Sequence, residues 1–195
     1  MGANTSNQRR IAGALLLLGF LLLFPAVFIN APGMGENSFW GRRLPFLFDQ
    51  AGRKYWSVAF AVVTLFGLGI LEGVLRQAGD NVFSRIGMVS FTLATAIWLV
   101  AIALEARFGY MPDFESYFII LAFPAVLLYG VGMLRTRVVP AWVGIAVVVW
   151  SALMLIRTLP HNQGPLFYEP ALLLVAIVLL VQSDRDRNQS KSRAA

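Results

Sequence analysis

The sequence predicts an all-α protein, a polytopic transmembrane bundle of six helices. Three observations predict it: 58% of the 195 residues are apolar, only 13% are charged, and the apolar residues fall into six long runs. Soluble domains carry about 25% charged residues, and a helix needs about 20 mainly apolar residues to cross a bilayer. We therefore expect one transmembrane domain over residues 1–182 and no separate soluble domain.

The six predicted spans follow one another closely, and the last is the shortest, with Glu169 and Pro170 in its first turn. The first run could instead be a secretory signal whose removal leaves five spans, but its length and the bulky Ile29 near the cleavage point disfavour this. The polar residues 183–195 predict a disordered cytoplasmic tail. The spans cover residues 11–29, 56–75, 86–104, 116–134, 139–156 and 166–181.

Glycine and proline support these boundaries. Gly109 ends the third span, the sequence 78–81 ends the second, and Pro140 lies near the first position of the fifth. Pro25 and Pro124 lie inside spans, where they predict local kinks.

The distribution of Lys and Arg predicts that both termini are cytoplasmic. With that orientation ten cations lie inside and six outside, and cytoplasmic loops carry the excess in membrane proteins. Four of the six outer cations belong to one loop, residues 31–55. We expect a multi-pass protein of the bacterial cytoplasmic membrane.

The loop 31–55 is the longest connection and mixes aromatic with basic side chains. Such a mixture favours the headgroup zone, where rings are partly buried and charges stay hydrated. Two interpretations stay open. The loop could pack over the mouth of the bundle as an interfacial segment, or it could act as a lid over an outward-facing cavity or as a docking surface.

Ionisable residues near the hydrocarbon are candidates for function. Glu72 has a simple partner in Arg76, four residues later on the same helix. The others form a predicted outer polar cluster in which Arg157 pairs with one or both acids. Either these ion pairs pin the third, fifth and sixth helices, or the cluster is a substrate or proton site. The members of the predicted cluster are Glu105, Arg157, His161 and Glu169.

Small and hydroxyl side chains inside the spans predict packing rather than chemistry. Gly69 and Gly73 form a G-x-x-x-G pattern, which lets helices approach closely either within the chain or in a homodimer. Thr92 and Thr95 are expected to bond to the backbone of their own helix.

The residues that are absent or scarce exclude most chemistries. The chain has no cysteine and one histidine, and its lysines, Lys54 and Lys191, lie outside the spans. Retinal attachment, bis-histidine haem, thiolate metal sites and zinc motifs are therefore excluded within one chain. We predict no catalytic residue, no metal and no cofactor, hence no enzyme. A net charge of +6 on a mean hydropathy of +0.69 does not indicate a nucleic-acid binder.

One turn carries a recognisable pattern. Leu134-Arg135-Thr136, then Pro140, Trp142 and Gly144, spell L-R-[ST]-x-x-x-P-x-W-x-G. This turn resembles one between the fourth and fifth helices of uncharacterised bacterial six-helix integral membrane proteins. The resemblance implies a six-helix layout with a long first outer loop, and it implies no activity and no functional residue.

The sequence therefore predicts a non-enzymatic accessory or interaction component of the membrane. Its expected partners are membrane lipid and either another protein or a second copy of the chain. The alternative is a small transporter or permease with an outward-facing polar site at the predicted cluster.

Overall fold

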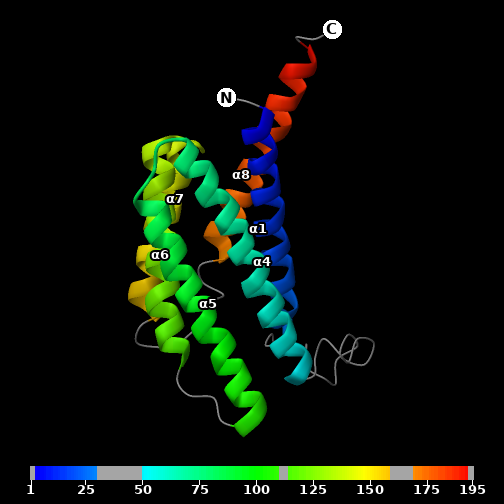
Figure 1. Cartoon of the computed structure of the whole chain (residues 1–195), viewed down its shortest axis with the longest axis vertical. Coiled ribbons are helices and arrows are strands. Elements are labelled where there is room, and N and C mark those ends of the chain that lie inside the picture. Colours follow the sequence, from blue (N-terminus) through cyan, green and yellow to red (C-terminus); the bar gives the residue numbers. More distant parts are fainter. Residues whose placement is uncertain (1–2, 30–49, 110–113, 159–168, 193–195) are drawn as a thin grey trace.

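In the computed structural model, the residues that the structure describes, 3–29, 50–109, 114–158 and 169–192, form six α-helices and no strand. The helices run up and down along one direction, and both chain termini lie at the same end (Figure 1). The all-α prediction is confirmed. The helices are α1 (Ala3–Ile29), α4 (Gln50–Gln77), α5 (Phe83–Phe108), α6 (Phe114–Thr136), α7 (Ala141–Thr158) and α8 (Glu169–Ser192).

The helices form two groups of three. In the first, α1 packs against both α4 and α8, and in the second, α6 packs against both α5 and α7. The two groups meet more sparsely, through α4 with α5 and α6 and through α7 with α8. Figure 1 shows the groups side by side, with α5, α6 and α7 on the left.

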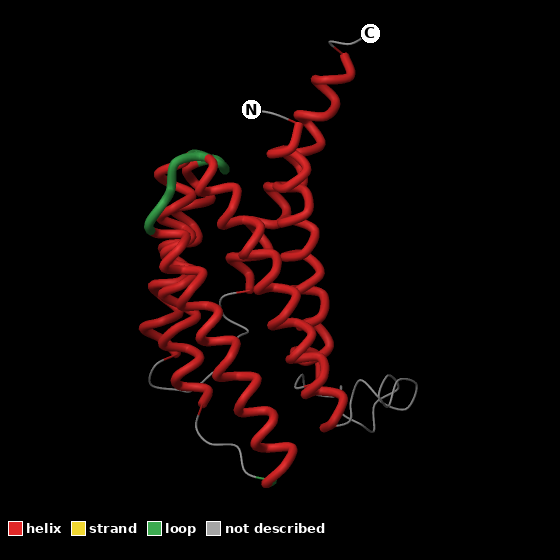
Figure 2. The backbone as a smooth tube through the Cα atoms, viewed as in Figure 1, coloured by secondary structure: helices red, strands yellow, loops and turns green. Residues whose placement is uncertain are grey.

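Two short turns lie at the end that holds the chain termini and are green in Figure 2. Between α4 and α5, Gly79 has φ 103°, a left-handed conformation that glycine adopts without steric cost. Between α6 and α7, Arg137 has φ 54°, and its N–H donates to the carbonyl of Met133 at 2.9 Å. At the other end of α5, Gly109 has φ 66° and closes the helix, as the sequence predicts.

Two predicted boundaries need correction. Helix α4 begins at Gln50, so residues 50–55 of the predicted loop 31–55 are helical, while residues 30–49 lie outside the described part. Helix α8 continues to Ser192, so the tail predicted to be disordered is helical at 183–192. Extending an existing helix costs little compared with nucleating one, which explains why polar residues continue α8 beyond its apolar part.

Glycines allow close approach at several helix crossings. A Cβ on Gly67 would lie 3.0 Å from the Leu16 side chain of α1, and one on Gly69 would lie 3.3 Å from Met88 of α5. A Cβ on Gly73 would meet nothing within 4 Å. Of the predicted Gly69–Gly73 pair, only Gly69 therefore packs within the chain.

Two polar contacts join the helices around α6. The Tyr129 hydroxyl donates to the Leu68 carbonyl of α4 at 3.1 Å and lies 3.3 Å from the Met88 sulfur of α5. The Ser90 hydroxyl donates to the Leu121 carbonyl at 2.8 Å. Leu121 lies three residues before Pro124, the proline inside α6, where the helix has lost one backbone N–H donor.

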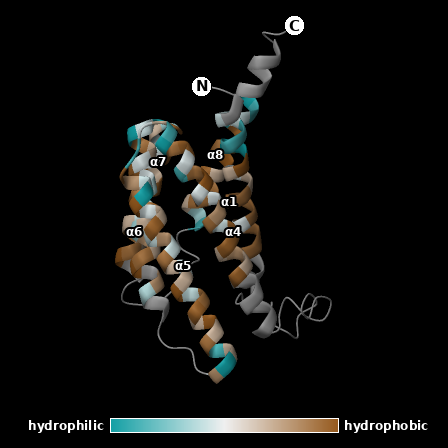
Figure 3. Cartoon of the chain, viewed as in Figure 1, coloured by the Kyte–Doolittle hydropathy of each residue, from teal (hydrophilic) through white to brown (hydrophobic). Residues whose placement is uncertain are grey.

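The outer surface of the bundle is apolar over its middle. Figure 3 shows hydrophobic colours along the central length of the helices and hydrophilic colours near their ends. Two described segments, Val58–Gln77 and Phe83–Phe108, are long and apolar enough to cross a membrane by length and composition. The count of six spans stays a prediction.

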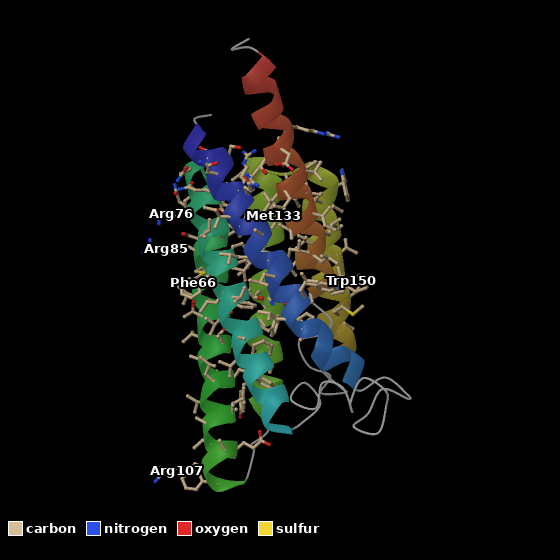
Figure 4. All side chains as sticks on the ribbon, turned by 90° about the vertical axis from the view of Figure 1, so that its right-hand side faces the viewer. Phe66, Arg76, Arg85, Arg107, Met133 and Trp150 are labelled. Atoms are coloured by element: carbon tan, nitrogen blue, oxygen red, sulfur yellow. The ribbon has the colours of Figure 1, made fainter. Side chains whose placement is uncertain are left out.

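Charged side chains gather at the two ends (Figure 4). Figure 4 places Arg76 and Arg85 toward one end and Arg107 at the other, with Phe66 and Trp150 on the outer surface between them. Phe66 is 64% exposed and Trp150 is 37% exposed. We call the end where the termini and the two short turns lie the basic end. Its described arginine side chains are those of Arg9, Arg10, Arg76, Arg85, Arg135, Arg137 and Arg185.

Candidate functional site

The structure places two of the four residues of the predicted cluster. Glu105 is half-buried in the last turns of α5, and Glu169 is the first residue of α8. Arg157 belongs to α7, but its side chain lies outside the described part, as does the whole of His161. The predicted pairing of Arg157 with either acid therefore stays a prediction.

Glu169 has the most unusual environment of the described acids. Its side chain is buried, with 1% of the residue exposed, and neither carboxylate oxygen has a hydrogen-bond partner among the residues that the structure describes. The start of α8, orange in Figure 1, lies well inside the length of the bundle, because α4 and α5 continue far beyond it toward the end opposite the basic end. A carboxylate in such a place is costly unless it is neutralised.

The helices that pack against α8 carry few charges. Helix α8 contacts α1 and α7, and α1 has no ionisable residue from Ile11 to Ile29. The ionisable residues of α1 are Arg9 and Arg10 at the basic end, and the single one in α7 is Arg157.

Three hydroxyl side chains share the burial of Glu169 and its lack of partners. Thr64 of α4, Thr95 of α5 and Ser151 of α7 are at most 1% exposed, and their hydroxyl oxygens have no hydrogen-bond partner. The prediction that Thr95 bonds to its own helix backbone is wrong, whereas Thr92 donates to the Met88 carbonyl at 2.7 Å as predicted. The two threonines differ in this respect although they lie on the same helix, since Thr95 faces the interior and Thr92 faces outward.

These side chains lie at similar depths below the basic end. Thr64 lies 13 residues before the end of α4, Thr95 lies 12 residues after the start of α5, and Ser151 lies 10 residues after the start of α7. At about 1.5 Å per residue these separations correspond to roughly 15–20 Å.

The depth of Glu169 follows from the packing of α1 on α8. Gly13 of α1 packs against Ala176 and Leu180 of α8, and it lies five residues below Gln8, whose amide accepts from Gln77 at the basic end. Counting from there places Glu169 roughly 20 Å below the basic end, a depth similar to that of the three hydroxyl groups. We call Thr64, Thr95, Ser151 and Glu169 the polar layer.

The basic end has a well-satisfied acid that the sequence reasoning missed. Asp80 is buried, and its carboxylate accepts the backbone N–H groups of Val82, Phe83 and Ser84 at 3.3, 3.1 and 2.8 Å. Burial raises the pKa of Asp80, but the hydrogen bonds from Ser84, Phe83 and Val82 outweigh it and lower that pKa below its ordinary value. Asp80 therefore caps the first turn of α5.

The signal for this cap was present in the sequence. Asp80 follows Gly79 and comes just before an apolar run, which is the pattern of a helix start. Its carboxylate also packs against Gly132 of α6, which has no Cβ to exclude it. That second contact depends on the fold and has no signal in the local sequence.

Two further interactions at the basic end confirm or extend the sequence analysis. Arg76 forms the predicted ion pair with Glu72 at 3.6 Å. The guanidinium of Arg135 lies 5.0 Å from the centre of the Phe83 ring, so the turn between α6 and α7 also packs on the start of α5.

The described residues hold no group of three or more His, Cys, Asp or Glu that could bind a metal ion. No family model matches the chain, and comparison with curated proteins and with solved structures finds no match. The assignment of a role therefore depends on the geometry of the chain itself.

Proposed function

We propose that the chain is an integral protein of the bacterial cytoplasmic membrane that crosses it six times, with both termini inside. The apolar middle of the outer surface supports this proposal, since exposed side chains such as Ile86, Val89 and Leu93 on α5 would be covered by lipid. The arginines of the basic end support the orientation, because cations accumulate on the cytoplasmic side.

The absence of cysteine makes the orientation easy to test. Arg137→Cys lies at the basic end and Arg107→Cys at the opposite end, and both native side chains are exposed. A membrane-impermeant maleimide added to intact spheroplasts should label Arg107→Cys alone, and both variants after lysis. Equal labelling of both variants in intact cells would contradict the proposal.

Within the membrane we propose that the chain is a small transporter or permease. The observation that carries this proposal is the polar layer, four buried polar side chains without partners near the middle of the bundle. Unsatisfied polar groups are expensive in hydrocarbon and are characteristic of pathways for ions and solutes. A purely structural bundle gains stability by replacing them with apolar side chains.

Transport is tested with the purified chain in proteoliposomes. Uptake of radiolabelled amino acids, sugars, nucleosides and organic acids is measured with and without an imposed pH gradient. Accumulation of one class by wild type, reduced in Glu169→Gln and retained in Glu72→Gln, would support the proposal. Uptake no different from that of empty vesicles for every class would contradict it.

The accessory or interaction role is the second candidate, and the open side of Gly73 favours it. A glycine on a membrane helix with no atom near its Cβ position lets another helix approach closely, from a partner protein or a second copy. Gly73→Leu should then shift the chain from dimer or complex to monomer in mild detergent, measured by light scattering. An unchanged oligomeric state would count against an interface on this face of α4.

A further inference from the structure

We propose that the carboxyl group of Glu169 takes up and releases a single proton inside the bundle, and that this proton is the coupling ion for transport. The coupling role rests on the transporter function proposed above. The binding of a proton stands on the burial and isolation of Glu169 alone.

A proton fits Glu169 better than a metal ion does. A carboxylate without a partner in an apolar interior must be neutralised, and a bound proton does this without further ligands. A metal ion instead needs several oxygen or nitrogen ligands arranged around it, and the described residues contain no cluster of His, Cys, Asp or Glu that could supply them.

The charged groups on the neighbouring helices leave one competing explanation. On α1 the nearest cations in sequence are Arg9 and Arg10, which lie at the basic end, roughly 20 Å from the level of Glu169. On α7 the single ionisable residue is Arg157. An ion pair between Arg157 and Glu169 would hold the carboxylate charged, and the experiment must separate this from proton binding.

The other members of the polar layer are hydroxyl groups at a similar depth on three other helices. The hydroxyls of Thr64, Thr95 and Ser151 can both donate and accept hydrogen bonds.

Dicyclohexylcarbodiimide provides the test, because this apolar reagent modifies protonated carboxyl groups within membranes. The full chain in lipid vesicles is treated at several pH values, and the modified residue is identified by mass spectrometry. We expect modification at Glu169, slower as the pH rises, with Glu72→Gln labelled like wild type at Glu169 and Glu169→Gln unlabelled at this position. No modification of Glu169 at any pH would overturn the proposal.

Two variants and one salt control remove the alternatives. Arg157→Gln should leave the labelling rate unchanged, and at least a tenfold increase would show instead that Arg157 had held Glu169 charged. Glu169→Asp keeps an acid at the position and should keep some labelling if the fold is intact. Protection by sodium chloride but not by choline chloride would overturn proton binding in favour of a sodium site.

The coupling role is measured separately, with a pH-sensitive dye inside proteoliposomes. Solute-driven proton movement should be lost in Glu169→Gln and retained in Glu72→Gln, whose native carboxylate pairs with Arg76. Labelling of Glu169 together with unchanged proton movement in Glu169→Gln would overturn the coupling role. If Glu169 of the wild-type chain is not labelled but solute uptake is intact, the proton site is overturned while the transporter function stands.

Discussion

The contact between Gly132 and Asp80 gives the sharpest stability prediction. In Gly132→Ala the new methyl group would occupy the space of the Asp80 Oδ2 atom, which accepts the Ser84 N–H at 2.8 Å. Either the carboxylate leaves the start of α5 or α6 moves away from it. Both responses disturb the joint between α4, α5 and α6.

The expected change in the free energy of unfolding combines one stabilising effect with two destabilising effects. Replacing glycine by alanine inside a helix gains about 1 kcal/mol from helix propensity. Displacing the carboxylate loses a charge-assisted hydrogen bond worth about 1.5–3 kcal/mol, and overpacking costs about 1–3 kcal/mol more. We expect Gly132→Ala to lower the free energy of unfolding by about 1.5–5 kcal/mol, a drop in Tm on the order of 3–20 °C.

Thermal unfolding in detergent, followed by tryptophan fluorescence, measures this effect against a matched control. Gly73→Ala makes the same substitution on α4, where the Cβ meets nothing within 4 Å, so Tm should stay level or rise. In an Asp80→Ala background, Gly132→Ala should cost little, because the next neighbour, a Leu75 methyl, lies at an ordinary 3.6 Å. A Tm for Gly132→Ala equal to that of Gly73→Ala would refute the reasoning.

Three further predictions concern single contacts. The pKa of Asp80 is lower in the folded state than its ordinary value of 3.8, so its carboxylate contributes fully to stability above pH 3.8. This contribution is lost as the pH falls through the lowered pKa. In Asp80→Asn, Tm should therefore fall less steeply with decreasing pH in the acid range. Ser90→Ala should cost about 1 kcal/mol in chemical unfolding by losing its bond to the Leu121 carbonyl, and a free energy of unfolding equal to that of wild type would argue against this contribution. Tyr129→Phe should also cost about 1 kcal/mol by losing its bond to the α4 backbone, and an unchanged midpoint would show that this bond contributes nothing.

The sequence was sufficient for the positions of the helices because long apolar runs are a strong and local signal. Local pairs such as Glu72 with Arg76, and the stop at Gly109, were predictable for the same reason. The helical conformation of residues 183–192 was not predictable, because their polar composition indicates only that they are not buried. It does not show that an existing helix can be extended at little cost in free energy.

The candidate site was predicted in part. Glu169 stood out in the sequence, but as a member of the predicted outer polar cluster. Its burial follows from where α8 begins between its neighbours, and that depends on the packing of α1 against α8. The sequence could not predict that the hydroxyls of Thr64 and Ser151 lie at a similar depth to Glu169. Each residue lies on a different helix, and the order of helices along the chain does not say how the helices are placed relative to one another.

The division into two groups of helices has a consequence for synthesis. Of the described helices, α8 is translated after the others but packs against α1, which is translated before them, whereas α5, α6 and α7 pack in the order in which they emerge. The second group can therefore assemble during translation, while the face of α1 around Gly13 stays without its partner until α8 has been made. Translation that stops before α8 leaves that face of α1 uncovered, which gives cellular quality control a distinct surface by which to recognise the truncated product.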